Sequence, residues 1–219
     1  MRWVYTPHMR HYSPIDKILI QIDAGLNTVF GHYVAQRHSP AAQFPEAHLS
    51  VEERNRSAAL MRVNHSGEVC AQALYRGQLN FSRAKHTHQL LEKAASEETD
   101  HLAWCDQRLQ SLKTHRSYLN FFWYWNSYAL GAFAALLGDR WSLGFLKETE
   151  IQVEQHLQKH LGLLPHEDIE SRAIVAQMKI DEAEHSHAAE AAGAAELPGF
   201  VKRWMGCCSK VMIHASYYL

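Results

Sequence analysis

The tetrapeptide Glu98-Thr99-Asp100-His101 has a counterpart further along the chain in Glu182-Ala183-Glu184-His185. In each, a glutamate precedes a histidine by three residues, a spacing that places both side chains on one face of an α-helix. A single match of this type is a weak signal, because Glu and His are common on solvated helix surfaces. Two matches in separate segments favour a shared site, and they predict that both segments are helical.

A further glutamate precedes each pair at a matched distance. Glu68 lies 30 residues before Glu98, and Glu150 lies 32 residues before Glu182. The chain therefore resembles a doubled helix pair, in which each half has one helix with a single Glu and one with Glu-x-x-His. Such a ligand set is typical of carboxylate-bridged di-iron sites in four-helix bundles, where the ligands project inward from all four helices.

The donor types favour iron or manganese over zinc, because carboxylates dominate and no thiolate is present. Four carboxylates offset the charge of two divalent cations, while two neutral imidazoles complete the ligand shells and leave positions for dioxygen. We expect two metal ions to be bound by Glu68, Glu98, His101, Glu150, Glu182 and His185. Glu148 and Glu154 compete with Glu150 by position, and only the matched spacing of the two halves favours Glu150.

Apolar residues recur at helical spacing between few Gly and Pro, so the predicted fold class is all-α. Ser13-Pro14 opens a first amphipathic helix, and Ser50 with Glu53 forms a capping box for the second. The predicted helices cover about residues 15–30, 51–83, 87–113, 117–138, 141–161, 168–192 and 199–217. Residues 1–49 form an N-terminal extension with one helix and a loop, and residues 50–219 form the bundle, in a single domain overall.

The predicted crossover segment 117–138 carries no charged residue and is crowded with aromatic side chains. Its length would allow a membrane span, whereas its asparagines and aromatic residues suit the interfacial zone of a membrane. A transmembrane helix, a buried core helix and a membrane-facing helix all stay open. The last helix, 199–217, combines an apolar stripe with charged residues that are all basic. That pattern suits packing on the bundle or contact with an anionic membrane surface.

The overall charge is balanced, with 22 Lys and Arg against 23 Asp and Glu and a formal net charge of −1. Nucleic-acid binding usually needs a basic field, so we expect no nucleic-acid partner. The four cysteines show no CxxC pair and no disulfide-type spacing, and the N-terminus lacks the apolar run of a secretory signal. These features predict a protein on the reducing, cytoplasmic side.

Several motifs follow one another in a fixed order. They are Asn64-His65-Ser66-Gly67-Glu68, Tyr75-Arg76-Gly77-Gln78, Glu98-x-x-His101, Glu150, Asp181-Glu182-Ala183-Glu184-His185 and Ala194-Ala195-Glu196-Leu197-Pro198. Together with the uncharged central segment, they resemble the demethoxyubiquinone hydroxylase family from about Met9 onward. The resemblance implies a ferritin-like bundle with peripheral or membrane-facing extra helices. It also implies catalytic, iron-bridging roles for Glu98 and Glu182.

In the pattern of that family, Glu68 and His101 bind one iron, and Glu150 and His185 bind the other. The implied activity is hydroxylation of a polyprenyl benzoquinol ring with dioxygen during ubiquinone synthesis. The implied partners are the polyprenyl quinol, the lipid surface of the membrane and other proteins of ubiquinone biosynthesis. We therefore expect a peripheral protein on the cytoplasmic side of a bacterial cell membrane.

Four residues outside the ligand set are candidates to support it. Tyr75 lies seven residues after Glu68, on the same helix face, and could hydrogen-bond a ligand or the substrate; an ordinary core tyrosine is the equal alternative. Asp181 and Glu97 directly precede the two metal-binding glutamates of the repeated motif, and metal-bound histidines commonly donate to such acids. Similarity to the family suggests that His156 delivers electrons or protons, although helical geometry turns it away from the ligand face.

Two other protein classes could use the same constellation. A ferritin-like iron-storage or ferroxidase protein needs a charged, shell-forming exterior, which the uncharged aromatic segment does not suit. A di-iron transfer-RNA hydroxylase should show a basic surface, of which the overall charge gives no sign. The electron donor, the isoprenoid chain length and the oligomeric state stay open.

Overall fold

The computed structural model describes residues 12–219. Residues 1–11 of the predicted N-terminal extension, including Met9 where the family resemblance begins, lie outside the described residues. The described chain is helical throughout and confirms the all-α prediction. Its elements are α1 (Pro14–Phe30), η1 (Pro40–Gln43), α2 (Val51–Phe81), α3 (Lys85–Ser111), α4 (Asn120–Leu136), α5 (Asp139–Leu163), α6 (Ile169–Ala191) and α7 (Gly199–Tyr218).

The first two long helices begin as their capping signals predict. The Ser13 hydroxyl accepts from the Asp16 backbone N–H, and the Asp16 carboxylate accepts from the Ser13 backbone N–H. Ser50 and Glu53 form the same reciprocal pair at the start of α2. Each box satisfies backbone donors that would otherwise have no partner at the helix end.

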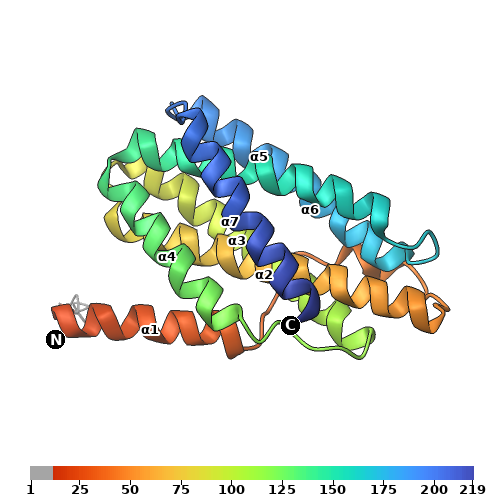
Figure 1. The fold of residues 1–219 in the computed structure, drawn as a ribbon. Coiled ribbons are helices and arrows are strands. Elements are labelled where there is room, and N and C mark those ends of the chain that lie inside the picture. Colours follow the sequence, from red (N-terminus) through yellow and green to blue (C-terminus); the bar gives the residue numbers. More distant parts are fainter. Residues whose placement is uncertain (1–11) are drawn as a thin grey trace, which may run out of the picture.

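Four helices form the bundle, with α2 and α3 as one pair and α5 and α6 as the other (Figure 1). Helix α4 is the crossover between the pairs and packs along α2, as expected for a ferritin-like bundle. Helix α7 lies against α2 and α5. Helix α1 contacts α2 and α4, and much of its length extends beyond the bundle.

Two glycines allow α2 and α4 to cross at very short range. A Cβ atom at Gly77 would lie 2.2 Å from the backbone oxygen of Tyr128, and one at Gly131 would lie 2.1 Å from that of Leu74. Any side chain at either position would therefore force the helices apart. The close crossing holds the uncharged helix firmly against the bundle.

The core of the four-helix bundle has two apolar layers separated by a charged one, and a third apolar cluster packs α1 and α4 against α2 and α3. One layer lies toward the start of α2 and contains Met61, Trp104, Leu157, Ile174 and Met178. The other lies toward the end of α2 and contains Tyr75, Leu91, Leu146 and Ala189. The six predicted ligands occupy the middle of the same four helices. Such a charged layer is costly to bury unless its groups are paired or bind metal.

Helix α4 is buried along one face and exposed along the other. Tyr124 and Ala135 are fully buried, whereas Phe121, Phe122 and Phe133 are 49%, 56% and 61% exposed. Within residues 12–219, no helix is both long enough and apolar enough to cross a membrane.

Candidate metal centre

The six predicted ligands converge in the centre of the bundle. Their donor atoms form two groups, in each of which all ligand atoms lie within 4.8 Å of one another. The first group is Glu68, Glu98, His101 and Glu182, and the second is Glu98, Glu150, Glu182 and His185. Glu98 and Glu182 belong to both groups, which is the position expected of bridging carboxylates. All six side chains are buried.

Each histidine turns Nδ1 toward the carboxylates. His101 Nδ1 lies 3.5 Å from Glu68, 3.4 Å from Glu98 and 3.2 Å from Glu182. His185 Nδ1 lies 3.1 Å from Glu182 and 3.5 Å from Glu98. The Nε2 atoms therefore face away from the cluster, toward other partners.

The hydrogen-bonding pattern fits a pair of cations. Within the six predicted ligands, five buried donor or acceptor atoms have no hydrogen-bond partner: both oxygens of Glu98, one oxygen each of Glu150 and Glu182, and His101 Nδ1. Buried polar atoms are normally satisfied, so a cluster of exceptions calls for an explanation such as a bound ion. Oxygen-rich coordination with two imidazoles suits iron or manganese.

Burial and the closeness of the acidic groups also raise the pKa values of four of these ligands. Burial, and then the neighbouring carboxylates, raise the pKa of Glu68 and Glu150 well above the usual range. Burial alone would lower the pKa of the two histidines, but hydrogen bonds to acidic partners raise that of His101 strongly and that of His185 to about 9. These shifts favour protonated forms that offset the negative charge of the carboxylates, the role that bound cations would otherwise have.

Each histidine is hydrogen-bonded to a carboxylate from the other half of the chain. Asp181 on α6 accepts from His101 Nε2 of α3 at 2.9 Å, and Glu97 on α3 accepts from His185 Nε2 of α6 at 2.7 Å. Burial would raise the pKa of Asp181, but its hydrogen bonds bring it down to about 2. Metal-binding histidines usually donate their second N–H to a carboxylate in this way.

Comparison with known proteins agrees with this geometry. A family model described as ubiquinone biosynthesis protein COQ7 matches residues 55–216. The chain belongs to this family. A 3-demethoxyubiquinol 3-hydroxylase of Xanthomonas oryzae pv. oryzae is 52% identical over 214 residues, which cover 98% of this chain and 99% of that relative. One of the same name from Xylella fastidiosa is 50% identical over 208 residues, 95% of this chain and 96% of that relative.

Two further side chains of this COQ7 family member were candidates near the metal. The Tyr75 hydroxyl donates to Glu150 Oε1, so it contacts a predicted ligand directly. His156 instead packs its ring on His160, with 3.9 Å between ring centroids, and its Nε2 has no partner. Among the described residues, His156 forms no hydrogen bond or ion pair with the six ligands.

Some site neighbours escaped the sequence analysis. His160 is buried and its Nδ1 lies 2.6 Å from Asn64 Oδ1, one helical turn before Glu68. Burial lowers the pKa of His160 to about 3, so its ring is neutral. Arg37, in the loop before α2, reaches the outer side of the cluster. No periodic pattern in the sequence marks His160 or Arg37. The pairing of His160 with Asn64 joins α5 to α2.

An apolar pocket lies between α4, the first turns of α5 and the start of α7. Its volume is about 560 Å³, and its lining is apolar or aromatic throughout: Leu130, Phe133, Ala134, Leu137, Trp141, Phe145, Leu197, Pro198, Phe200, Val201 and Trp204. A smaller pocket of about 120 Å³ shares Leu130, Phe145 and Trp204 with it. The smaller pocket also includes Leu74 and Thr149, the chain neighbours of Tyr75 and Glu150.

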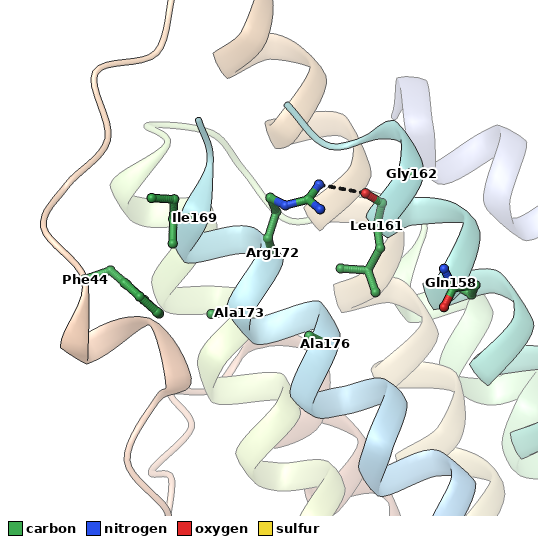
Figure 2. A pocket seen from close by; sticks show the side chains of 8 residues that line it. All are labelled: Phe44, Gln158, Leu161, Gly162, Ile169, Arg172, Ala173 and Ala176. Carbon is green, nitrogen blue, oxygen red and sulfur yellow. Dashed lines mark hydrogen bonds between the residues drawn. The ribbon is translucent and has the colours of Figure 1, made fainter. Parts of the chain in front are cut away.

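A separate hollow of about 530 Å³ lies between η1 and the ends of α5 and α6 (Figure 2). Its only charged lining residue, Arg172, donates to the backbone oxygens of Leu161 and Leu164 at 2.7 and 3.3 Å. The guanidinium therefore caps the last turn of α5. None of the residues that line this hollow belongs to the metal cluster. The one charged side chain in its lining is explained by its capping of α5.

Proposed function

We propose that this protein is a di-iron, dioxygen-dependent monooxygenase that hydroxylates the quinol ring of a polyprenyl demethoxyubiquinol. The observation that carries the proposal is the buried layer of four carboxylates and two imidazoles, in a chain of the ubiquinone biosynthesis family. The relatives named 3-demethoxyubiquinol 3-hydroxylase support the same reaction. Glu98 and Glu182 would help to hold both irons, because each belongs to both ligand groups.

Bound iron would supply the reductive activation of dioxygen, in which one oxygen atom enters the ring C–H bond and the other leaves as water, with two electrons and two protons consumed. The protein's own contribution is positioning. Tyr75 donates to Glu150 and fixes that carboxylate, while Asp181 and Glu97 fix the two imidazoles. The surrounding apolar layers exclude water from the reacting ring.

We place the substrate ring at the side of α2 that carries Gly67, the residue before Glu68. Gly67 is partly exposed in the middle of α2, and a Cβ atom built there would meet no atom within 4 Å. Gly in a helix interior is destabilising relative to Ala by roughly 0.5–1 kcal/mol, and no packing contact at Gly67 requires it. Open space for a planar ring next to a ligand accounts for the glycine.

The polyprenyl tail would follow the apolar pocket. The larger pocket and the smaller one share three lining residues, and together they extend from Thr149, next to Glu150, to the molecular surface. Around the outer pocket, Phe133, Leu137 and Phe200 are 61%, 56% and 68% exposed. An isoprenoid chain has no hydrogen-bonding groups, and a lining without charge matches that chemistry.

The same exposed side chains favour a lipid surface as the source of the substrate. Helix α1 exposes seven large apolar residues, and α4 and α7 expose others: Ile15, Ile18, Leu19, Ile20, Ile22, Leu26, Phe30, Phe121, Phe122, Phe133, Leu136, Phe200, Trp204, Val211 and Tyr218. Apolar surface of this extent marks an interaction site. Peripheral attachment to the cytoplasmic side of a bacterial membrane would let the tail slide directly from lipid into the pocket.

The test is complementation of a bacterial host that lacks this hydroxylation step. The native chain should restore ubiquinone, whereas Glu182→Ala should leave the demethoxy precursor unchanged. Glu184→Ala is the matched control, because Glu184 is exposed on the same helix and should complement like the native chain. If an iron-loaded, membrane-bound native chain fails to complement, the substrate assignment is wrong.

The family assignment favours hydroxylation over iron storage and over modification of transfer RNA. The near-neutral charge also offers no basic surface for RNA. A purified protein that forms a large, iron-filled shell would reopen the storage alternative.

A further inference from the structure

Arg37 lies in the loop between α1 and α2, outside the four bundle helices, yet its side chain reaches the outer side of the metal centre. Its Nε donates to Asp100 Oδ2 at 2.7 Å, and its Nη2 donates to Asp181 Oδ2 at 2.9 Å. Asp100 belongs to α3 and Asp181 to α6. One guanidinium therefore joins the two helices that carry the Glu-x-x-His pairs.

The backbone of the loop that contains Arg37 is also hydrogen-bonded to Asp100. The backbone N–H groups of Gln36 and Arg37 donate to Asp100 Oδ1 at 2.6 and 3.4 Å. The guanidinium lies over the Trp104 ring, 4.8 Å from its centroid, and the Trp104 indole donates to the Arg37 backbone oxygen at 3.4 Å. A planar guanidinium offers a rigid fork of donors that the ammonium of lysine cannot reproduce.

The oxygen that Arg37 holds is the oxygen that His101 uses. Asp181 Oδ2 lies 2.9 Å from His101 Nε2, the ring nitrogen that faces away from the carboxylates. When Nδ1 binds a metal ion, Nε2 carries the ring N–H and donates a hydrogen bond to Asp181. Gln177 donates to the other oxygen of Asp181 at 2.9 Å, so rotation of this carboxylate would break several bonds together.

The second histidine has no comparable bridge among the described residues. His185 Nε2 lies 2.7 Å from Glu97, whose side chain is 27% exposed. The cation next to Glu97 is Lys93, at 3.4 Å, and its side chain is 72% exposed. Exposed pairs of this type contribute little and hold geometry weakly. Asp181, the acceptor for His101, is therefore held more firmly than Glu97, the acceptor for His185.

We propose that Arg37 is a positioning residue of the metal centre, which fixes Asp181 against α3 and so sets the orientation of His101 and the affinity for the metal ion that His101 binds. This inference rests on the proposed di-metal site and makes its two metal positions unequal. Without the guanidinium, Asp181 loses its link to Asp100, and His101 loses a fixed acceptor. The His185 side of the site keeps its contacts.

The experiment compares Arg37→Gln with a matched control, Arg116→Gln. Arg116 also pairs with a carboxylate of α3, Asp106 at 2.6 Å, and also lies over an aromatic ring, that of Tyr33, at 4.7 Å. Its contacts do not include Asp181 or either histidine. Both variants lose similar interactions, and only one is expected to affect the metal centre.

The first measurement is titration of metal-free protein with cobalt(II) against a competing chelator. In Arg37→Gln, affinity for one of the two ions should fall about tenfold, as for other losses of outer hydrogen-bond partners, while the other ion binds as in the native protein. Arg37→Lys keeps the charge but not the fork, so it should recover part of this loss. It also provides a milder variant if Arg37→Gln does not fold.

The second measurement is proton NMR of the cobalt-loaded protein, in which the ring N–H protons of metal-bound histidines have strongly shifted signals. Asp181→Asn and Glu97→Gln assign these signals to His101 and His185. In Arg37→Gln, the His101 N–H should exchange faster with water, and the His185 N–H should not change. Arg116→Gln should leave both signals unchanged.

Unchanged cobalt affinity and N–H exchange in Arg37→Gln and Arg37→Lys would overturn the inference. Equal changes at both histidines would also overturn it, because they would indicate general loosening of the bundle. A native chain that binds no metal ion would overturn the proposed metal centre and this inference with it. Native binding of two ions with unchanged Arg37 variants would overturn the inference alone.

Discussion

Metal uptake by the metal-free protein should release protons, because four of the six ligands have raised pKa values. Burial raises the pKa of Glu68 and Glu150 well above the usual range. Hydrogen bonds outweigh burial at the histidines, so the pKa of His101 is well above its usual value and that of His185 is about 9. These shifts all favour the protonated forms, with which a divalent cation must compete.

The expected release is therefore about four protons per chain when both ions bind. Each displaced proton changes the free energy of metal binding by about 1.4 kcal/mol per pH unit, so binding of the pair should strengthen by about 5 kcal/mol per pH unit near neutrality. The sign follows from the direction of the shifts, since raised pKa values make protons stronger competitors at low pH. The dependence should weaken as pH rises past the pKa of His185, about 9.

Anaerobic addition of cobalt(II) to weakly buffered protein with an indicator dye measures the protons directly. Cobalt avoids the extra protons that oxidation of iron would release. Glu68→Gln should release about one proton fewer than the native protein, whereas Glu184→Gln, which changes an exposed carboxylate, should match the native count. Release of one proton or none would refute the protonation pattern derived from burial and hydrogen bonding.

Three other perturbations test packing and substrate access. Gly131→Ala should lower the free energy of unfolding by about 3 kcal/mol in chemical denaturation, because its Cβ would lie 2.1 Å from the Leu74 backbone oxygen; an unchanged midpoint would contradict the close crossing. Gly67→Ala should raise stability by about 0.5–1 kcal/mol, while Gly67→Leu should keep the fold and lower turnover by filling the space beside Glu68. Val201→Trp should raise KM for a long-tailed quinol but not for a short-tailed analogue, and equal effects on both would refute the tail pocket.

Much of the fold and of the clustering of the candidate ligands was predictable because the decisive relations are local. The i, i+3 spacing of Glu98 with His101 depends only on helix geometry, and the structure brings both residues into one ligand group. Capping boxes likewise involve residues three positions apart, and α2 begins where Ser50 predicts. The bounds of α5 and α6 differ from the predictions by only a few residues, as helix ends usually do.

The contacts around the ligands were not predictable, because they depend on the path of the chain in space. Arg37 meets Asp181 across 144 positions of sequence, through a loop without a periodic pattern. His160 reaches Asn64 only because α5 and α2 pack together at that height. The environment of α4 was also undetermined, since an uncharged aromatic sequence is compatible with a buried face, an exposed face or both.

Each histidine is oriented by an acid from the other half of the chain, so the two halves depend on each other to form the site. The acid that orients His101 belongs to α6, and the acid that orients His185 belongs to α3. A fragment containing only α2 and α3 would keep three ligands but lose the acceptor for its own imidazole, and a fragment containing α5 and α6 would have the same defect. Neither half is a smaller version of the whole. Fragments separated in the α4 segment should bind metal in the native way only after they reassociate.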